Sequence, residues 1–531
     1  MSQSLQWAKT ILDTTQTIYS PSPIATDNHH NILHTITTTD NIHIGSTFLT
    51  HHGLIPDLYL MKYDSSGRLV WINDLKISNK AAFIKSISVD KDDNIYVAGT
   101  SIADTLYINA TDYIANPTKT ACIFLIKYTS GGSVIWHTSS NTSGPAYNID
   151  ITGLTLDINS NILLTGYFDD TLVLSGKSIT LPVASNVSVF IAKYGSDGNI
   201  KWLKRPDTCT CSGSTIASDE NGNIYTGGFF ASRFVWGSTV LGTPLTNIKN
   251  GWVAKLDTAG NMLWANAIGS PSDYAYDNTW HVVADKKGYV FASGYLDGAM
   301  VAGFPTTKYF FSGYNTTGTR LWYYDYVFAD GEDADALDID ANGYPYLSVT
   351  HNLSANVGGI VVPKSDSGGS FIGKFDKLTG NAIWIINPSS LYFSAVTALS
   401  VDKNGGNIAI SGSFTDTLKF GGLSLFTPAY MYSNVFISRL YNPVLGTTNL
   451  ETNNSLFTIY PNPAHDIISV KFVTAGNKIL NVTDVNGKLL INKLVSDSNN
   501  VIDISLLLPG IYYLSVIDKN FKRQYRQFIK I

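Results

Sequence analysis

The sequence repeats itself with a period of about 62 residues, and this period restricts the possible folds more than any other feature. A tryptophan recurs seven times at the same place in the repeat, in step with an aspartate that opens a polar turn. A third landmark is an aromatic residue three positions before a basic one, although the fifth copy has Gly313 in the basic position. The two main series are Trp7, Trp71, Trp136, Trp202, Trp264, Trp322 and Trp384, and Asp27, Asp90, Asp157, Asp219, Asp285, Asp340 and Asp402. Such a chain is expected to fold as a series of similar units.

Each copy contains four short segments in which apolar and polar residues alternate, which is typical of half-buried β-strands. In the third copy these segments cover residues 152–156, 162–167 and 189–194, and the last begins near residue 200. Four antiparallel strands repeated around an axis make the blades of a β-propeller. We therefore predict an all-β fold with a seven-bladed β-propeller over residues 1–443. The period excludes the WD40 kind of propeller, whose repeats have about 40–45 residues.

The phase of the repeat predicts how the propeller closes. The chain begins on an outer strand around Trp7, and the last copy ends on a strand at residues 435–440 without an outer strand of its own. We expect these two segments to pair and complete one blade, because pairing removes the exposed strand edges at which sheets aggregate.

The copies resemble the propeller repeats of the SBBP family, and the resemblance covers residues 1 to about 443. The copy at residues 219–228 and 252–264 is nearest to the family pattern. The first copy departs from the pattern, as does the sixth, which has Val349 where glycine is usual. The resemblance implies a fold and says little about activity.

The residues after the repeats follow a different pattern. Residues 444–455 are a polar linker, and residues 456–531 contain no repeat landmark but several short alternating runs. These runs, with the tight-turn signal Asn486-Gly487, predict a small Ig-like β-sandwich. Residues 456–531 carry nine Lys or Arg and five Asp, net +4, whereas the rest of the chain carries 27 basic and 36 acidic residues, net −9. The change of sign predicts a domain boundary.

Several motifs in residues 456–531 resemble those of the C-terminal sorting domain on cargo of the type IX (Por) secretion system of Bacteroidota. The resemblance implies export across the outer membrane, recognition by the type IX translocon and sortase machinery, and attachment to the cell surface or release. The basic end of the domain could dock on an acidic receptor surface, or its charges could simply protect an edge strand. The residues that carry the motifs are Tyr460, Pro461, Asn462, Pro463, Asp484, Gly487, Lys488, Gly510, Tyr512 and Lys530.

The first residues conflict with this export route at first sight. Residues 1–7 have neither the basic nor the apolar segment of a signal peptide, yet such cargo must first reach the periplasm. Because the first blade strand begins close to Met1, we expect the chain to start at a mature terminus with an added Met, the signal peptide having been removed.

Composition argues against two classes of protein. No run approaches the roughly 18 consecutive apolar residues of a spanning helix, so no transmembrane segment is expected. With a formal net charge of −5, the chain lacks the excess of basic residues that is typical of proteins that bind nucleic acid, so no nucleic-acid partner is expected.

Aromatic residues are the main candidates for ligand binding. Loops that join the outer strand of one blade to the inner strand of the next lie on one face of a propeller, and aromatic side chains with polar tips suit a glycan or a surface-protein partner. The alternative is that alternate members pack between blades. The candidates are Tyr274, Tyr276, Trp280, Tyr323, Tyr324, Tyr326 and Tyr392.

Metal binding has weak support in the sequence. The acidic run around Asp330, Glu332, Asp333 and Asp335 could hold calcium, which prefers several carboxylates in one loop, but a solvated loop explains the run as well. Six of the ten histidines, at positions 29, 30, 34, 43, 51 and 52, lie in the first blade without the ligand spacing of a zinc site. We expect these histidines to be polar residues at the surface, and we expect no cofactor.

The three cysteines indicate neither a disulfide framework nor a zinc site. Cys209 and Cys211 are separated by one residue, a spacing too short for a comfortable bridge. Both are therefore expected to be free thiols in a loop.

The sequence contains no nucleophile elbow, HExxH, Walker or dinucleotide motif. We expect a secreted or cell-surface cargo protein whose propeller acts in binding or adhesion, more a binding protein than an enzyme. The alternative is a secreted polysaccharide hydrolase or lyase with its site at the propeller mouth, since paired carboxylates can lie far apart in sequence.

Overall fold

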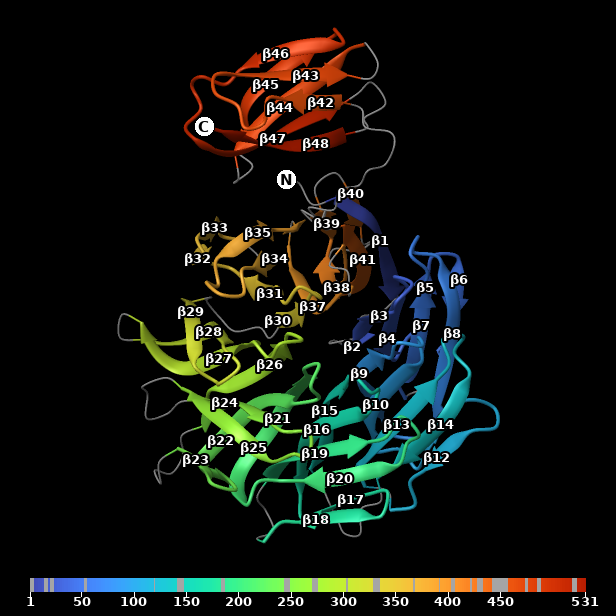
Figure 1. The fold of residues 1–531 in the computed structure, drawn as a ribbon. Helices are drawn as coiled ribbons and strands as arrows, with labels where there is room; N and C mark the ends of the chain where they lie inside the picture. Colours follow the sequence, from blue (N-terminus) through green and yellow to red (C-terminus); the bar gives the residue numbers. More distant parts are fainter. Residues whose placement is uncertain are drawn as a thin grey trace. The chain divides into compact units, whose positions relative to one another are not determined.

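The computed structural model contains only β-strands in its described part, which confirms the all-β class. The contacts divide the chain into two compact units, one of residues 3–444 and the other mainly of residues 445–531 (Figure 1). The predicted linker at residues 444–455 lies outside the described residues. The described residues are 4–13, 18–19, 23–51, 55–118, 120–140, 148–182, 187–242, 249–269, 276–301, 304–327, 335–365, 368–390, 392–402, 406–420, 423–426, 433–441, 457–472, 476–484, 489–517 and 523–531.

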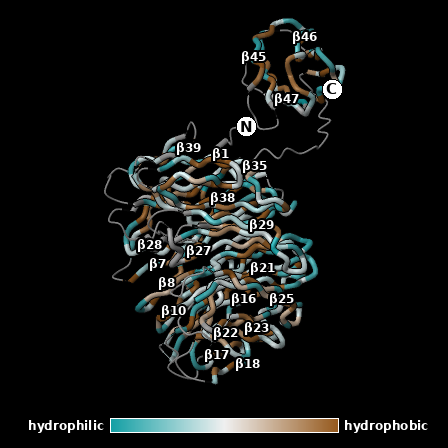
Figure 2. The backbone as a smooth tube through the Cα atoms, turned by 90° about the vertical axis from the view of Figure 1, so that its left-hand side faces the viewer, coloured by the Kyte–Doolittle hydropathy of each residue, from teal (hydrophilic) through white to brown (hydrophobic). Residues whose placement is uncertain are grey.

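The large unit is a succession of antiparallel sheets, each with a path of four strands in the predicted order, and hydrophobic and hydrophilic residues alternate along them (Figure 2). From inner to outer strand, the first three are β3 (Ile24–Thr26), β4 (Ile32–Thr38), β7 (Asp57–Tyr63) and β8 (Leu69–Ile77); β9 (Ala82–Val89), β10 (Ile95–Ser101), β13 (Cys122–Tyr128) and β14 (Val134–Ser139); and β15 (Ile149–Leu156), β16 (Ile162–Asp169), β19 (Val187–Tyr194) and β20 (Ile200–Lys204). The others are β21 (Thr208–Ser218), β22 (Ile224–Trp236), β24 (Lys249–Leu256) and β25 (Met262–Ile268); β26 (Asn278–Ala284), β27 (Val290–Val301), β28 (Phe304–Tyr314) and β29 (Arg320–Val327); β30 (Asp335–Ile339), β31 (Pro345–His351), β34 (Gly369–Phe375) and β35 (Ala382–Ile386); and β37 (Ser394–Val401), β38 (Asn407–Thr415), β41 (Ser433–Tyr441) and β1 (Ser4–Asp13).

The inner strands are neighbours in a cycle. Each of β3, β9, β15, β21, β26 and β30 contacts the inner strand that follows it, and β37 contacts β3. The first and last strands of the large unit belong to the same sheet, because β1 pairs antiparallel with β41, with Trp7 opposite Arg439 and Ile11 opposite Val435. The predicted pairing of the terminal segments is therefore confirmed.

The glycine of the repeat is required by a bulge in the inner strand. In the last sheet one residue is inserted between Val396 and Ala398, and the carbonyl oxygen of Ala395 is pushed against Gly412 of β38. A Cβ on Gly412 would lie 1.9 Å from that oxygen. The sixth sheet has Val349 at this position, and there β30 pairs with β31 without a bulge.

The aspartate and the lysine of the repeat hold the inner turn in five of the sheets. In the third sheet Asp157 Oδ1 accepts backbone N–H bonds from Asn159 and Asn161, and Lys193 Nζ lies 2.9 Å from Asp157 Oδ2. Burial alone would raise the pKa of Asp157, but hydrogen bonds from Asn161 and Lys193 outweigh burial and hold the pKa below its usual value. The ion pair thus fixes the turn at the end of the inner strand.

The tryptophan of the repeat joins neighbouring sheets. Trp136 Nε1 donates to the carbonyl of Ser196, in the turn between the third and fourth strands of the next sheet. Gly198 of that turn has a φ of 82° and lies against the ring, so that a Cβ there would be 3.1 Å from Trp136. Equivalent bonds are made by Trp7 to Ser65, Trp71 to Ser130, Trp202 to Thr258, Trp264 to Thr316 and Trp322 to Lys377.

Short hairpins in the links form a second connection between sheets. The link after β10 folds into β11 (Thr105–Tyr107) and β12 (Tyr113–Ala115), and β11 pairs with β8 of the preceding sheet. The corresponding β5 (Ile42–Ile44) pairs with β1. The remaining short strands are β2 (Ile18–Tyr19), β6 (Thr47–Leu49), β17 (Thr171–Leu174), β18 (Lys177–Thr180), β23 (Thr239–Leu241), β32 (Ala355–Val357), β33 (Ile360–Val362), β36 (Ser389–Ser390), β39 (Thr417–Phe420) and β40 (Leu423–Phe426).

The structure corrects the prediction for the cysteine pair. Cys209 and Cys211 form a disulfide within β21, instead of being free thiols in a loop. The register of β21 shifts between Thr208 and Thr210, and the two Cα atoms lie 5.4 Å apart, within the range that a disulfide requires. The sequence spacing alone does not show this bulge.

The C-terminal unit consists of two sheets that enclose one apolar core, as predicted for a sandwich. One sheet has the order β42 (Phe457–Tyr460), β43 (Ile467–Phe472) and β46 (Asn499–Asp503). The other has the order β45 (Leu489–Val495), β44 (Lys478–Asp484), β47 (Gly510–Ile517) and β48 (Arg523–Lys530). Phe457, Leu480 and Phe528 are fully buried between them.

Candidate functional site

The structure does not gather the predicted aromatic residues on one exposed face. Tyr276 and Tyr392 are about half exposed, at 49% and 48%. Tyr323, Tyr324 and Tyr326 belong to β29, and Trp280 belongs to β26. Tyr326 is buried, and the other three are partly buried and contact neighbouring rings: for example, the Trp280 ring lies 4.7 Å from that of Tyr295. Tyr274 lies outside the described residues.

The exposed Tyr276 has a lysine as its neighbour. Lys249 Nζ lies 4.9 Å from the ring centre of Tyr276 and 4.8 Å from that of Phe229. The ammonium group is held between two aromatic faces, which stabilises the start of β26 more than it offers a binding surface.

The acidic run does not reveal a calcium site in the described part of the chain. Asp330, Glu332 and Asp333 lie outside the described residues, and Asp335 pairs with Val349 at the start of β30. The calcium hypothesis therefore stays a prediction for this run.

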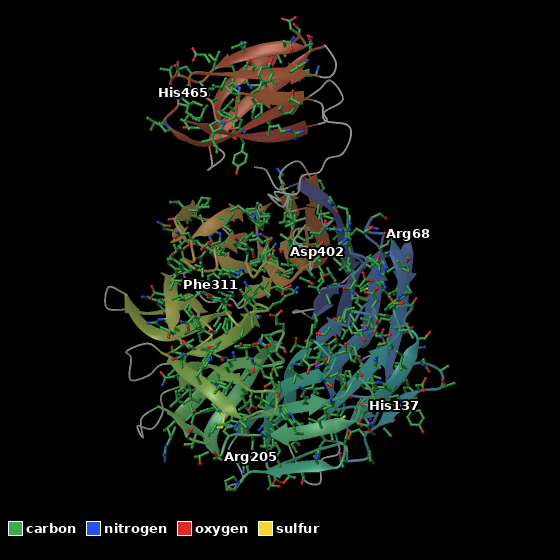
Figure 3. All side chains as sticks on the ribbon, in the orientation of Figure 1. Arg68, His137, Arg205, Phe311, Asp402 and His465 are labelled. Atoms are coloured by element: carbon green, nitrogen blue, oxygen red, sulfur yellow. A yellow bond between two sulfur atoms is a disulfide. The ribbon has the colours of Figure 1, made fainter. Side chains whose placement is uncertain are left out.

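The histidines of the first sheet are not merely surface groups, contrary to expectation. His34 is fully buried in β4, and its Nε2 lies 2.8 Å from Ser411 Oγ of β38. Burial lowers the pKa of His34 to about 3, so the ring is neutral at ordinary pH. His30 Nδ1 lies 3.1 Å from Oδ2 of Asp402, which Figure 3 labels at the junction of the last sheet with the first. The burial of His34 cannot be predicted from the sequence alone, because its ring contacts β38, which lies far along the chain from β4.

Three residues of the first two sheets come close enough to hold a metal ion. The ligand atoms of Asp27, His29 and Asp93 lie within 4.8 Å of one another, and His29 Nδ1 is 2.6 Å from Asp93 Oδ2. Asp27, however, already accepts from Asn31 and from Lys62 Nζ at 2.9 Å. The lysine supplies the positive charge that a metal would bring, so this cluster joins the two sheets without one.

The motif residues of the C-terminal unit converge on its last strand. Tyr460 to Pro463 form an exposed turn after β42, and Asn462 Oδ1 accepts the N–H of Ile529 at 2.9 Å. Ala464, next in the chain, exchanges backbone hydrogen bonds with Ile529 and Ile531. The turn therefore fastens the first sheet of the sandwich to β48.

A second group of motif residues lies on the same strand. Gly510 pairs with Lys530, and the Tyr512 ring stacks on Phe528 with centroids 5.6 Å apart. Lys530 is buried, and its Nζ donates to the carbonyl of Ile531, so it is not part of a free basic surface. Asp484 ends β44 opposite Tyr512. Gly487 and Lys488 lie outside the described residues.

A groove at the edge of the first sheet was missed by the sequence analysis. It has a volume of about 530 Å³ and lies where β8 meets the hairpin of β11 and β12. We call it the tyrosine groove. No motif marks it, because it forms only when the link of the second repeat pairs with the outer strand of the first. Its lining residues are Asp74, Lys76, Ile77, Tyr107, Asn109 and Ala110.

Two family models match the chain. The secretion system C-terminal sorting domain (Por secretion tail) matches residues 458–530, and the SBBP beta-propeller repeat matches residues 75–107. These matches confirm both resemblances found in the sequence. An uncharacterized WD repeat-containing protein of Acanthamoeba polyphaga mimivirus is 30% identical over 178 residues, which are 31% of this chain and 12% of that relative. The matched segment thus spans about an eighth of that relative's length.

Solved structures give weaker likenesses. Quinohemoprotein alcohol dehydrogenase from Comamonas testosteroni aligns at 11% identity and a TM-score of 0.36, over 88% of this chain and 79% of that one. A protein of unknown function from Bacteroides caccae aligns at 10% identity and a TM-score of 0.34, over 64% and 94%. Likenesses this low say nothing of the activity of this chain. The described residues include no helix with the length and apolar character of a membrane span.

Proposed function

Because the chain carries a type IX sorting domain, and is therefore cargo that meets the type IX machinery and is exported to the cell surface or extracellular space, we propose that its propeller works there as a binding module. The single observation that carries this proposal is the tyrosine groove. It is a hollow within the usual size range of ligand sites, about 300–1,000 Å³, and its lining combines the exposed ring of Tyr107 with charged groups.

The groove supports binding better than catalysis. Its lining includes one carboxylate, Asp74, and no histidine. General acid–base hydrolysis of a glycosidic bond needs two carboxyl groups flanking the bond. A single carboxylate beside an ammonium group and the phenol ring of Tyr107 can hold a ligand by stacking and hydrogen bonds without cleaving it.

The experiment uses the full chain secreted by a producing cell. Retention of the protein on insoluble polysaccharides and on whole bacterial cells is measured together with the release of reducing sugar from the same polysaccharides. The proposal expects saturable retention and no release of sugar above a blank. Steady release of sugar would instead favour a hydrolase, and no retention on any surface would contradict the binding function.

A further inference from the structure

We propose that the tyrosine groove binds a neutral glycan, with sugar rings stacked on Tyr107 in the groove and on its cross-strand neighbour Tyr113, and sugar hydroxyls bonded to Asp74 and Lys76. This inference rests on the proposed binding function and names the ligand class of the same site. It is argued from the pairing of the strands, the exposure of the two rings and the opposite charges beside them.

The strand pairing places the four side chains on one face. Tyr107 of β11 lies directly opposite Tyr113 of β12 and, on its other side, opposite Lys76 of β8. Residues two apart on a strand share a face, so Asp74 lies beside Lys76 on the same side. β8 and β12 lie on the same flank of the large unit in Figure 1. The face thus offers two aromatic rings in a row with a charged pair.

Both tyrosine rings are about half exposed to solvent. Tyr107 is 44% and Tyr113 is 55% exposed, with ring centroids 6.3 Å apart and planes tilted by 47°. Covering an apolar ring that is open to water lowers the free energy, which favours binding of a ligand there. Sugar rings present C–H groups on their faces and hydroxyl groups at their edges, and therefore match an aromatic face bordered by polar groups.

The hairpin that carries the rings is rigid. Asn109 Oδ1 accepts the N–H groups of Thr111 and Asp112, and Asn109 Nδ2 donates to Asp112 Oδ2 at 2.7 Å. Ile108, between Tyr107 and this turn, is buried. A ligand would meet rings already held in place, so binding would cost little ordering of the protein.

The charged pair selects against charged ligands. An anionic ligand would be attracted by Lys76 but repelled by Asp74, and a cationic ligand would meet the reverse. A hydroxyl group can donate to the carboxylate and accept from the ammonium group.

The neighbouring hairpin provides a matched control. In β5 and β6, His43 and Phe48 occupy a cross-strand pair of the same kind, and Phe48 is as exposed as the tyrosines. Neither His43 nor Phe48 lines the tyrosine groove. A Phe48→Ala change therefore removes an equally exposed aromatic ring outside the tyrosine groove.

The test measures affinity of the full chain for soluble β-glucan, mannan, xylan and dextran by affinity electrophoresis. Tyr107→Ala and Tyr113→Ala are expected to weaken binding to at least one of them by about tenfold or more, Tyr107→Phe to retain most of it, and Phe48→Ala to leave it unchanged. Near-ultraviolet circular dichroism checks that each variant is folded. A polyanion, pectate, and a polyproline peptide serve as competing ligands.

The outcomes separate this inference from the proposed function. If the chain binds a neutral polysaccharide but the tyrosine variants bind equally well, the groove is not the site, and the binding function stands. If the chain prefers pectate or the proline peptide, or binds only cells, the ligand class is wrong and the binding function again stands. If it binds neither polysaccharides nor cells, both are overturned.

Discussion

Lys377 Nζ lies 3.3 Å from Asp285 Oδ2, although the two residues belong to different sheets. In the other copies the lysine or arginine comes from the third strand of the same sheet, but the fifth sheet has Gly313 there. A Cβ on Gly313 would lie 2.4 Å from Trp322, whose ring fills the space and contacts Phe311, labelled in Figure 3. The next sheet therefore supplies the cation that the fifth sheet cannot accommodate.

Replacing Lys377 by Met is expected to destabilise the propeller by about 1–3 kcal/mol, because it leaves the buried Asp285 carboxylate without its cation. The measurement is the free energy of unfolding in urea. Lys287→Met is the control, since Lys287 is an exposed lysine in the same turn as Asp285. Equal stability of the two variants would show that the pair contributes nothing.

Replacing Gly412 by Ala is expected to cost about 3 kcal/mol or more, because the new Cβ must displace the Ala395 carbonyl and with it the bulge. Gly406→Ala, in the turn just before β38, meets nothing within 4 Å and serves as the control. The measurement is again the free energy of unfolding in urea. A Gly412→Ala protein as stable as the control would contradict the steric role of this glycine.

The repeat could be predicted because its landmark residues perform the same task in each sheet. Trp136, Lys193 and Gly198 recur because every inner turn and every junction needs a hydrogen-bond donor, a cation and room for a ring. The tyrosine groove could not be predicted, since Tyr107 and Lys76 meet only through pairing between two copies. The number of blades in the closed ring stays a prediction.

Trp384 does not make the hydrogen bond to the next sheet that the other repeat tryptophans make. Its Nε1 is buried and has no partner among the described residues. In the last sheet the third strand is β41 and the fourth strand, β1, comes from the start of the chain. No turn connects these two strands, so none can offer the carbonyl that the other tryptophans use. Sequence alone gives Trp384 the same expected role as the other six.

Because His34 is buried, we expect the protein to lose stability in mild acid. An unfolded histidine takes up a proton as the pH falls through about 6.5, but His34 in the folded protein does so only at about 3. The unfolded state therefore binds more protons between these values, and stability falls with falling pH by up to about 1.4 kcal/mol per pH unit.

His34→Gln keeps a polar partner for Ser411 and is expected to flatten this dependence between pH 6.5 and 5, measured as the thermal midpoint at each pH. A smaller slope remains from His351, whose pKa burial also lowers. His43→Gln, at an exposed site, should leave the slope as it is. An unchanged slope in His34→Gln would mean that His34 is not the group responsible.

The exposed turn at residues 460–463 predicts a link between the fold of the sorting domain and export. Asn462→Ala removes the acceptor for the Ile529 N–H and is expected to destabilise that domain by about 1 kcal/mol. Because the turn fastens the first sheet to β48, we expect a smaller exported fraction, measured by immunoblot of cells and medium. Asn492→Ala, which loses only an exposed bond to Asn481, is the control, and a chain without residues 456–531 gives the level without export. Full export of a destabilised Asn462→Ala protein would show that the type IX machinery does not require this contact.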